Sequence, residues 1–432
     1  MTFLGRQVGR LYHERTLFAK AMKFAKIIPG RGEGGGSKLA TRIAIAFVLG
    51  ALAGLLIGPR VVVLQPLGEV FIRLLRMLVL PIVVLTLLAG LTAPAPVGIG
   101  RLSVKTVACS LLFSLCATLI GLAVAVGLHP GRGMPLPAHA APQAEILKLS
   151  LRDFLLGIIP ENVIAAIVRG DLLAVIFFTI LLGLAIARLR NSPSHSSAVE
   201  SLHRGLEALR QAVTVILGWV MAYAPIATFA LVATLFGEAR AGVATQFLRA
   251  IVAVYAGHAL IGLLCLTALR LAGVSPLWFL RGIKAPLLTA FITGSSAASL
   301  PVEIEAAAHA LGLDRRLSTL ILSLGAAIHK IGTAVHLAVM VVFAVNAVGM
   351  PAGFEQYSLL GLLVLAGAVG TPPISGGAYV VLGFIFEQAG LPLSLIGVLL
   401  AIPLLAKFST PLNSLGRLTV TVLLSPRQCY QE

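Results

Sequence analysis

The sequence predicts an all-α polytopic membrane protein, and three observations support this fold class. Hydrophobic residues make up 58% of the 432 residues and charged residues only 11%, and the mean hydropathy is +1.00. Because a soluble domain carries about 25% charged residues, this chain lacks the polar residues of a soluble surface. Apolar runs of about 20 residues, the length of a membrane-spanning helix, recur along the whole chain. The short alternating segments typical of a β-barrel are missing from the sequence.

Seven apolar runs and one broken apolar region give the expected membrane segments in chain order. The first 37 residues precede them and read as a basic cytoplasmic tail that ends in a Gly-rich linker. The runs and the broken region lie at 39–58, 66–93, 104–128, 172–187, 213–236, 250–273, 317–347 and 358–425. We expect eight transmembrane helices in total, an even number that returns the C-terminus to the side of the N-terminus.

The distribution of charge orients these segments. The formal net charge is +17, and nine of the 33 basic residues lie between Arg6 and Arg42. A second basic tract occupies 188–211. Since Lys and Arg are retained on the cytoplasmic side, we expect both termini in the cytoplasm and a multi-pass protein of a bacterial-type inner membrane. Without aromatic residues interleaved on a solvated basic face, the charge does not indicate a nucleic-acid partner.

Two stretches interrupt the regular pattern of spanning helices. The first, 276–303, has a centre of small and hydroxyl-bearing residues, and the second, 358–390, contains the adjacent Pro372 and Pro373, which cannot continue a helix. Both read as re-entrant helical hairpins with an irregular tip. Irregular backbone at membrane depth is tolerated where protein buries it or where it lines a watery cavity, so paired interruptions indicate a transport site. The alternative is a pair of surface loops that join ordinary helices.

No motif for an enzyme, a cofactor or a metal is recognised. The four cysteines form no CxxC pair, and the GxGxxG match at 30–35 lacks the strand and the βαβ unit of a dinucleotide site. HExxH and P-loop motifs do not occur. We therefore expect no enzymatic activity, no cofactor and no bound metal.

Six segments, in order, resemble the dicarboxylate/amino acid:cation symporter family, which includes the glutamate transporters. They are RLLRMLVLPIVV (73–84), GDLLAVIFFTILLGLAIA (170–187), MAYAPIATFAL (221–231), GSSAASLP (294–301), LGAAIHKIGTA (324–334) and AVGTPPISGGA (368–378). The resemblance implies a homotrimer with a glutamate-transporter-like elevator fold, in which a transport domain moves against a scaffold.

The resemblance also divides the chain into four parts. Residues 1–37 are the tail and linker, and 427–432 are a C-terminal tail. Residues 38–273 hold transmembrane helices 1–6, which are mostly scaffold and trimer contacts, with helices 3 and 6 belonging to the transport domain. Residues 274–426 form the transport core of hairpin 1, helix 7, hairpin 2 and helix 8.

The chain departs from the family where the family binds sodium and an amino group. The family's Asn-Met-Asp-Gly-Thr break in helix 7 reads here from His329 to Thr333, with Ile331 at the acidic position. An ungapped alignment puts Lys407 at the amino-binding Asp and Thr410 at the carboxylate-binding Arg of helix 8. It also puts Leu418 at a sodium-binding Asp, and Phe113 at a hydroxyl ligand of helix 3.

The number of acidic residues in this part of the chain, which requires no alignment, also indicates that the family's sodium ligands are missing. Between 315 and 425 the only acidic residues are Glu355 and Glu387, and neither is expected at the centre of a functional helix. Sodium sites normally include carboxylates, and a Lys at such a place repels a cation. Sodium coupling through the usual sites is therefore not expected.

The interruptions and the resemblance together give the candidate site residues. The expected ion-coupling or cation-substitute residues are His329 and Lys330, because intramembrane ionisable residues are costly and indicate function. The alternatives are a lysine that snorkels to an interface or a decayed paralogue. We expect Arg417 to snorkel and His336 to be a satisfied buried imidazole. The expected substrate-binding residues are Ser295, Ser296, Ala297, Thr333, Thr371, Pro372, Ser375, Gly376, Lys407 and Thr410.

The sequence thus predicts a secondary transporter of a small organic anion, a dicarboxylate or a related acid, in the lipid bilayer. Protons are a candidate coupling ion, and two further copies of the chain are the expected protein partners. One alternative is an amino-acid cation symporter for glutamate or aspartate. The other is an anion-conducting or non-transporting relative of the same fold.

Overall fold

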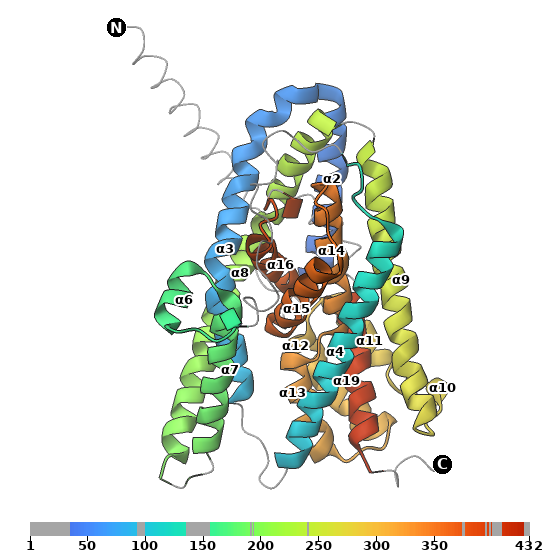
Figure 1. The fold of residues 1–432 in the computed structure, drawn as a ribbon. Helices are drawn as coiled ribbons and strands as arrows, with labels where there is room; N and C mark the ends of the chain where they lie inside the picture. Colours follow the sequence, from blue (N-terminus) through green and yellow to red (C-terminus); the bar gives the residue numbers. More distant parts are fainter. Residues whose placement is uncertain are drawn as a thin grey trace.

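The computed structural model describes residues 35–92, 100–134, 156–190, 192, 194–239, 242–373, 376–393, 395–396, 399 and 408–426. Every regular element in this part of the chain is helical (Figure 1). The predicted all-helical fold class is therefore confirmed. Ser375 and Lys407, two of the expected substrate-binding residues, lie outside the described residues.

One group of helices comes from the part of the chain between Gly35 and Ala239 and does not include α4. α2 (Gly35–Ile57) and α3 (Gln65–Leu91), joined by the 3₁₀ turn η1 (Gly58–Leu64), both pack along the 44-residue helix α8 (Ser196–Ala239). α7 (Leu172–Leu189) packs against α3 and is preceded by the short α6 (Val163–Arg169). In Figure 1, α3, α6, α7 and α8 lie on the left of the molecule.

The second group surrounds one fully enclosed helix, α14 (Ile331–Ala347). Of its 17 residues only Asn346 is not buried. α4 (Gly100–Leu128), α9 (Gly242–Leu271) and α19 (Ser409–Leu424) pack against it. A helix that is apolar on all sides must be enclosed by other elements, and here protein supplies the enclosure.

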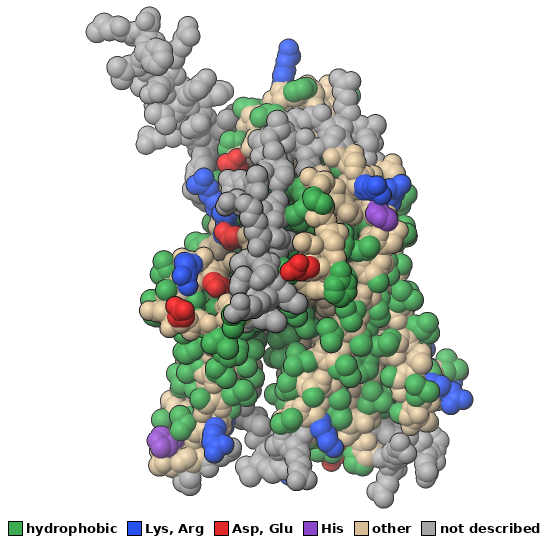
Figure 2. All heavy atoms as spheres, in the orientation of Figure 1, with side chains coloured by type: hydrophobic (Ala, Val, Ile, Leu, Met, Phe, Trp, Pro, Cys, Tyr) green, Lys and Arg blue, Asp and Glu red, His purple; other side chains and the backbone are tan. Residues whose placement is uncertain are grey.

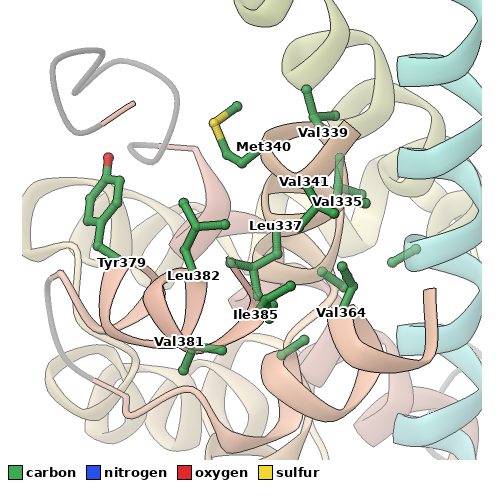
Figure 3. Close-up of a cluster of buried hydrophobic side chains, with 14 of the residues drawn as sticks. Val335, Leu337, Val339, Met340, Val341, Val364, Tyr379, Val381, Leu382 and Ile385 are labelled. Carbon is green, nitrogen blue, oxygen red and sulfur yellow. The ribbon is translucent and has the colours of Figure 1, made fainter. Parts of the chain in front are cut away.

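The remaining faces of α14 are covered by a pair of helices that follow it, α15 (Phe354–Gly370) and α16 (Gly377–Gln388). Figure 3 shows Val335 and Leu337 of α14 beside Val364 of α15 and Leu382 and Ile385 of α16. All of these side chains are at most 2% exposed. The pair α15–α16 is therefore fixed to α14 by an apolar core.

Glycines bring α4 and α9 into close contact with the same residue of α14. A Cβ atom added to Gly121 of α4 would lie 3.0 Å from the Cα of Val335, and one added to Gly257 of α9 would lie 2.6 Å from Val335 Cγ1. Any larger side chain at either position would overlap Val335. Both helices therefore approach α14 more closely than a larger side chain at these positions would permit.

Helix pairs joined by short turns lie where the two interruptions were expected. The first pair is α11 (Lys284–Thr293) and α12 (Ser296–Glu305), preceded by α10 (Pro276–Gly282) and followed by the π-helical turn η3 (Ala306–Ala310). Its turn contains Gly294, whose φ of +61° lies in the left-handed region that favours glycine. The second pair is α15 and α16, whose connection contains both adjacent prolines. α13 (Arg315–Ile328) links the first pair to α14.

Five helical segments in the described residues are long and apolar enough to cross a membrane. They are Thr41–Leu91, Leu102–Leu128, Ser196–Gly237, Thr245–Leu271 and Arg315–Ala347. Thr41–Leu91 spans 51 residues and contains two of the expected runs. Large apolar side chains are exposed on these helices, for example Trp219 at 69% and Leu271 at 84%. Figure 2 shows most charged side chains above and below a wide hydrophobic band, as a multi-pass membrane protein requires.

Candidate functional site

The helix that runs through the centre of the second group is broken at two residues. α13 ends at Ile328 and α14 begins at Ile331, while His329 and Lys330 have non-helical backbone angles. The break lies in the segment from His329 to Thr333 where the resemblance implies it. At a helix break the last carbonyls of one half and the first N–H groups of the other lose their helical partners. Those groups need other partners, because the break is buried.

Asn413 of α19 satisfies the first N–H groups of α14. Its Oδ1 accepts hydrogen bonds from the backbone N–H of Gly332 (2.9 Å) and of Thr333 (3.3 Å). Its Nδ2 donates to Thr333 Oγ1 at 3.0 Å. A Cβ on Gly332 would lie 2.8 Å from the Cα of Ser409, so only glycine permits this approach of α19. The N-terminus of α14 is thus occupied by a neutral amide side chain.

His258 of α9 binds the backbone carbonyl group of Gly332. Its Nε2 lies 3.0 Å from the carbonyl oxygen of Gly332, so the N–H at this nitrogen donates to it. His258 is 4% exposed. Both backbone groups of Gly332 are therefore held by side chains from other helices.

Lys330 lies at the break and is 1% exposed. Its Nζ donates a hydrogen bond of 2.8 Å to the carbonyl oxygen of Ala326, in the last turn of α13. A cation at a helix C-terminus is stabilised by the partial negative charge of the end carbonyls. The side chain does not extend to the protein surface, so the snorkelling alternative does not describe Lys330.

His329 is fully buried beside Lys330. Its ring lies 6.1 Å from the ring of Phe113, and neither ring nitrogen has a hydrogen-bond partner in the described part of the chain. A Cβ on Gly416 would overlap the imidazole. His336 follows seven residues later, in α14. Its ring packs edge-on against the ring of Tyr379, with the ring centroids 5.9 Å apart.

A buried ion pair links α12 to α19 and corrects the expectation for Arg417. Arg417 and Glu303 have fully buried side chains. The Nε of Arg417 donates to Glu303 Oε2 at 2.9 Å, and Nη2 donates to Oε1. Ser299 (2.8 Å) and Ser414 also donate to Oε1. The snorkelling prediction for Arg417 is wrong, because α12, α13 and α14 cover this face of α19 and a carboxylate lies within reach.

The tips of the two helix pairs meet at one carbonyl oxygen. Pro373, in the second tip, accepts hydrogen bonds from Ser295 Oγ (2.9 Å) and from the backbone N–H of Ala297 (3.0 Å). Ser295 also caps α12, since its Oγ accepts from the N–H of Ala298 at 3.3 Å. Thr371 is buried and donates to the carbonyl oxygen of Gly367 at 2.9 Å. The expected substrate residues of the two tips are therefore neighbours.

The other expected residues fall into two groups. Ser296, Pro372 and Gly376 lie in or beside the tips, and Gly376 has a left-handed φ of +85°. Thr333 is held by Asn413, and Thr410 is half-buried on α19, three residues before Asn413.

Sequence reasoning did not identify Glu303, Asn413 or His258. Glu303 could have been found by the rule applied to Lys330, because it is an ionisable residue within an apolar hairpin. The same rule could have found His258, which lies within the apolar run 250–273, whereas Asn413 carries no comparable signal. Their roles depend on which helices lie against the break.

Among the buried charged side chains around the break, basic groups outnumber acidic ones in the described residues. At the break and behind the first hairpin, two basic side chains, Lys330 and Arg417, are buried with one acidic side chain, Glu303. Within the described residues there is no group of three or more His, Cys, Asp or Glu side chains that could hold a metal ion.

Most of the chain is similar to known membrane transporters. The profile of the sodium:dicarboxylate symporter family matches residues 39–426. The chain is 31% identical over 363 residues to a C4-dicarboxylate transport protein of Deinococcus deserti, covering 82% of this chain and 80% of that protein. It is 30% identical over 355 residues to a C4-dicarboxylate transport protein of Rhizobium etli, covering 80% and 79%. It is also 30% identical over 387 residues to the neutral amino acid transporter B(0) of Bos taurus, covering 81% and 70%.

Proposed function

This chain belongs to the sodium:dicarboxylate symporter family, and from that premise we propose that it transports a small dicarboxylate without sodium at the family's usual sites. The family consists of membrane transporters, and two of the relatives described above are C4-dicarboxylate transport proteins. We place the substrate between the two hairpin tips and the break that precedes α14. The task of the protein is to lower the barrier for an anion to cross the bilayer.

The observation that carries the proposal is the buried side chain of Lys330. Its ammonium would occupy the place at the helix break where the family holds a metal cation, and it contacts a backbone carbonyl at 2.8 Å. An ammonium donates three hydrogen bonds, so it can bind exposed carbonyls and still provide positive charge for an anion. Because Arg417 and Glu303 neutralise each other, the charge of Lys330 is the surplus of the site.

The positions of the acidic residues support independence from sodium. Glu387 has a 52% exposed side chain that lies 3.9 Å from Arg76, and Glu355 is exposed at the start of α15. Ile331 and Leu418, at the positions aligned with sodium-binding acids, are fully buried and apolar. Glu303, a buried acid on α12, is already paired with Arg417.

The first test measures uptake of radiolabelled succinate into proteoliposomes that contain the purified protein. We expect saturable uptake and exchange that change by less than about twofold when choline replaces sodium, because no acidic sodium ligand lies at the break. Uptake that disappears in choline would contradict the sodium-independent mechanism. Linear flux that follows voltage, without exchange, would instead indicate an anion channel.

Transport of neutral amino acids is a second candidate, since a neutral amino acid transporter is 30% identical to this chain. It is less favoured, because Lys407 aligns with the acid that holds the substrate amino group in the family. A protonated amine would meet like charge there. Succinate and malate should therefore compete for binding better than aspartate, glutamate or glutamine. Tighter binding of aspartate or glutamine than of succinate would favour the second candidate.

Lys330→Met tests the cation-substitute role directly. We expect succinate binding to weaken by about 30- to 150-fold, equivalent to ~2–3 kcal/mol, because the anion loses its counter-charge. Lys330→Arg should restore binding poorly, since a planar guanidinium does not fit a compact site. Lys105→Met, at an exposed lysine of α4, is the matched control. Normal transport by Lys330→Met would rule out the cation-substitute role.

The proposal includes the assembly and orientation of the protein. We propose a homotrimer in the inner membrane with both termini cytoplasmic and with 274–426 as the moving transport core, which contains His329 and Lys330. The mass of the detergent-solubilised complex tests the trimer. Labelling of single cysteines introduced at the two ends of the chain, in intact and in opened cells, tests the orientation.

A further inference from the structure

The corner of the chain between α9 and α11, which contains α10, is anchored to the protein interior by apolar side chains. Val274, Phe279 and Ile283 are at most 4% exposed. A Cβ on Gly282 would lie 2.5 Å from Cδ2 of Leu311, so α10 packs closely on the residue that follows η3. The backbone of this corner is therefore held in place from the inside.

The outer side of the same corner carries a stripe of exposed side chains. The backbone N–H of Ile283 donates to the carbonyl four residues earlier, so the helical path continues from α10 into α11. Exposed residues recur along this path at spacings of four, three and four, and they are Leu277, Arg281, Lys284 and Leu288. Residues at such spacings share one face of a helix. Two basic side chains thus lie between two leucines that are 58% and 60% exposed.

Three basic side chains, Arg270, Arg281 and Lys284, are exposed at this corner, and we call them the basic corner. α10 packs against α9, α11 and η3, and these three elements contain no acidic residue. Glu305, which precedes η3, is paired with Arg315. Within the described residues, no ion pair neutralises the basic corner. Its positive charge is available to a partner from outside the chain.

The basic corner lies at the edge of the hydrophobic surface. Figure 2 shows Lys and Arg side chains at the lower right, next to hydrophobic side chains, where Figure 1 places α10. Leu271, beside Arg270, is 84% exposed, and the half-buried Trp278 lies on α10. Trp is enriched where the hydrocarbon of a bilayer meets its headgroups, and long basic side chains extend towards those headgroups. This combination is typical of the level of the lipid phosphates.

We propose that the basic corner binds the headgroup phosphate of an anionic phospholipid, whose acyl chains lie along the neighbouring exposed leucines. A guanidinium donates two parallel hydrogen bonds to phosphate oxygens, and an ammonium adds a point charge. Basic pockets between membrane helices are known binding sites for anionic headgroups. The leucines of the stripe favour a lipid over free phosphate, because a soluble anion gains nothing from apolar surface.

The position of the basic corner gives the bound lipid a mechanical role. Arg281 and Lys284 lie at the base of the first hairpin, and α11 leads from them to the tip at Ser295. A headgroup held there attaches the base of this hairpin to the membrane surface. The inference concerns the bilayer and does not depend on the transported substrate.

Photocrosslinking of the full-length protein in phosphatidylcholine nanodiscs tests the proposal. The probe is phosphatidylglycerol with a photoreactive group in its headgroup, and peptide mapping should find the label within 270–288. In Arg281→Gln combined with Lys284→Gln, half-maximal labelling of this segment should require about 25-fold more probe, roughly fivefold for each lost charge. Arg60→Gln combined with Arg132→Gln removes two exposed arginines elsewhere and should label like the wild type.

Competition shows what the basic corner recognises. Unlabelled phosphatidylglycerol should reduce the labelling, whereas phosphatidylcholine should not. Inorganic phosphate should reduce it no more than sodium chloride at equal ionic strength. Arg281→Lys combined with Lys284→Arg keeps both charges and should label within about threefold of the wild type, which separates loss of charge from damage to the fold.

Three results would overturn the proposal. The first is unchanged labelling in the double glutamine variant, and the second is equal competition by phosphatidylcholine. The third is displacement by inorganic phosphate beyond the effect of ionic strength, which would assign the basic corner to a free anion. None of these results would affect the proposed transport function, which is measured with succinate.

Discussion

The helix break before α14 and the meeting point of the two hairpin tips are both interruptions in an apolar interior, but they are closed by different means. At the break, side chains from α9 and α19 bind both backbone groups of Gly332. At the tips, the described hydrogen bonds between the pairs both end on one carbonyl oxygen, that of Pro373. The break is buried, whereas Ser295 and Pro373 are half-buried and Ala297 is exposed.

The difference indicates which interruption can open. Separating the tips costs two neutral hydrogen bonds, each of about 0.5–1.5 kcal/mol. Opening the break would leave several buried polar groups unpaired, at about 1–3 kcal/mol for each. We therefore expect the break to be a permanent part of the site, and the tips to separate when a substrate enters or leaves.

The largest effect is expected for Glu303→Gln, which removes the charge that anchors the first hairpin to the side of the break. Arg417 would be left buried without a counter-charge, a loss of about 3–5 kcal/mol of folding free energy. The midpoint of thermal unfolding in detergent should fall accordingly. The double variant Glu303→Leu with Arg417→Met should recover most of the stability. An unchanged midpoint in Glu303→Gln would show that the ion pair does not hold the hairpin.

A smaller loss of stability is expected for Asn413→Ala, which removes the hydrogen-bond acceptor at the break and leaves every charged side chain in place. The N–H groups of Gly332 and Thr333 would lose their acceptor, at about 1–3 kcal/mol for each unpaired group. Stability and succinate affinity should both decline. Asn413→Asp keeps an acceptor at the same place and should retain more of both. Equal losses in the two variants would mean that the acceptor is not what matters.

The smallest effect is expected for Ser295→Ala, which removes the contact of Ser295 Oγ with Pro373 between the tips and the N-cap of α12. The lost hydrogen bond to Pro373 costs about 0.5–1.5 kcal/mol, roughly a two- to tenfold loss of succinate affinity, and the lost cap lowers stability by about 0.5–2 kcal/mol. Ser358→Ala is the matched control, because its hydroxyl bonds only within α15, to the Phe354 carbonyl at 2.7 Å. A change in thermal stability as large as that of Glu303→Gln would contradict the view that the tips are the weakly closed region.

Much of the helical framework could be predicted from the sequence, because lipid leaves a backbone few choices. An apolar run of membrane length must satisfy its own hydrogen bonds, so it becomes a helix. The run predicted at 66–93 is α3 (Gln65–Leu91), and the run at 104–128 lies within α4. Prolines and small polar residues likewise indicated both interruptions. These signals are local, so one sequence is sufficient to read them.

The pairing of charges could not be predicted in the same way. Arg417 was expected to snorkel, since its position on a helix does not reveal which elements cover that face. Its partner Glu303 is 114 residues away in the chain. The link between His258 and Gly332 spans 74 residues, and that between Asn413 and Gly332 spans 81. Such contacts are decided by the packing of distant segments, which a local pattern does not encode.

The contacts of two glycines with Val335 have a mechanical consequence. Gly121 of α4 and Gly257 of α9 leave no gap beside this residue of α14, so neither helix can slide along α14 without first being pushed outward. Loss of that packing would have to precede any shear between them. The lowest-cost displacement is one in which α4, α14 and α9 translate as a single rigid body. In such a movement the broken helix, with Lys330 inside it, would travel without changing its own geometry.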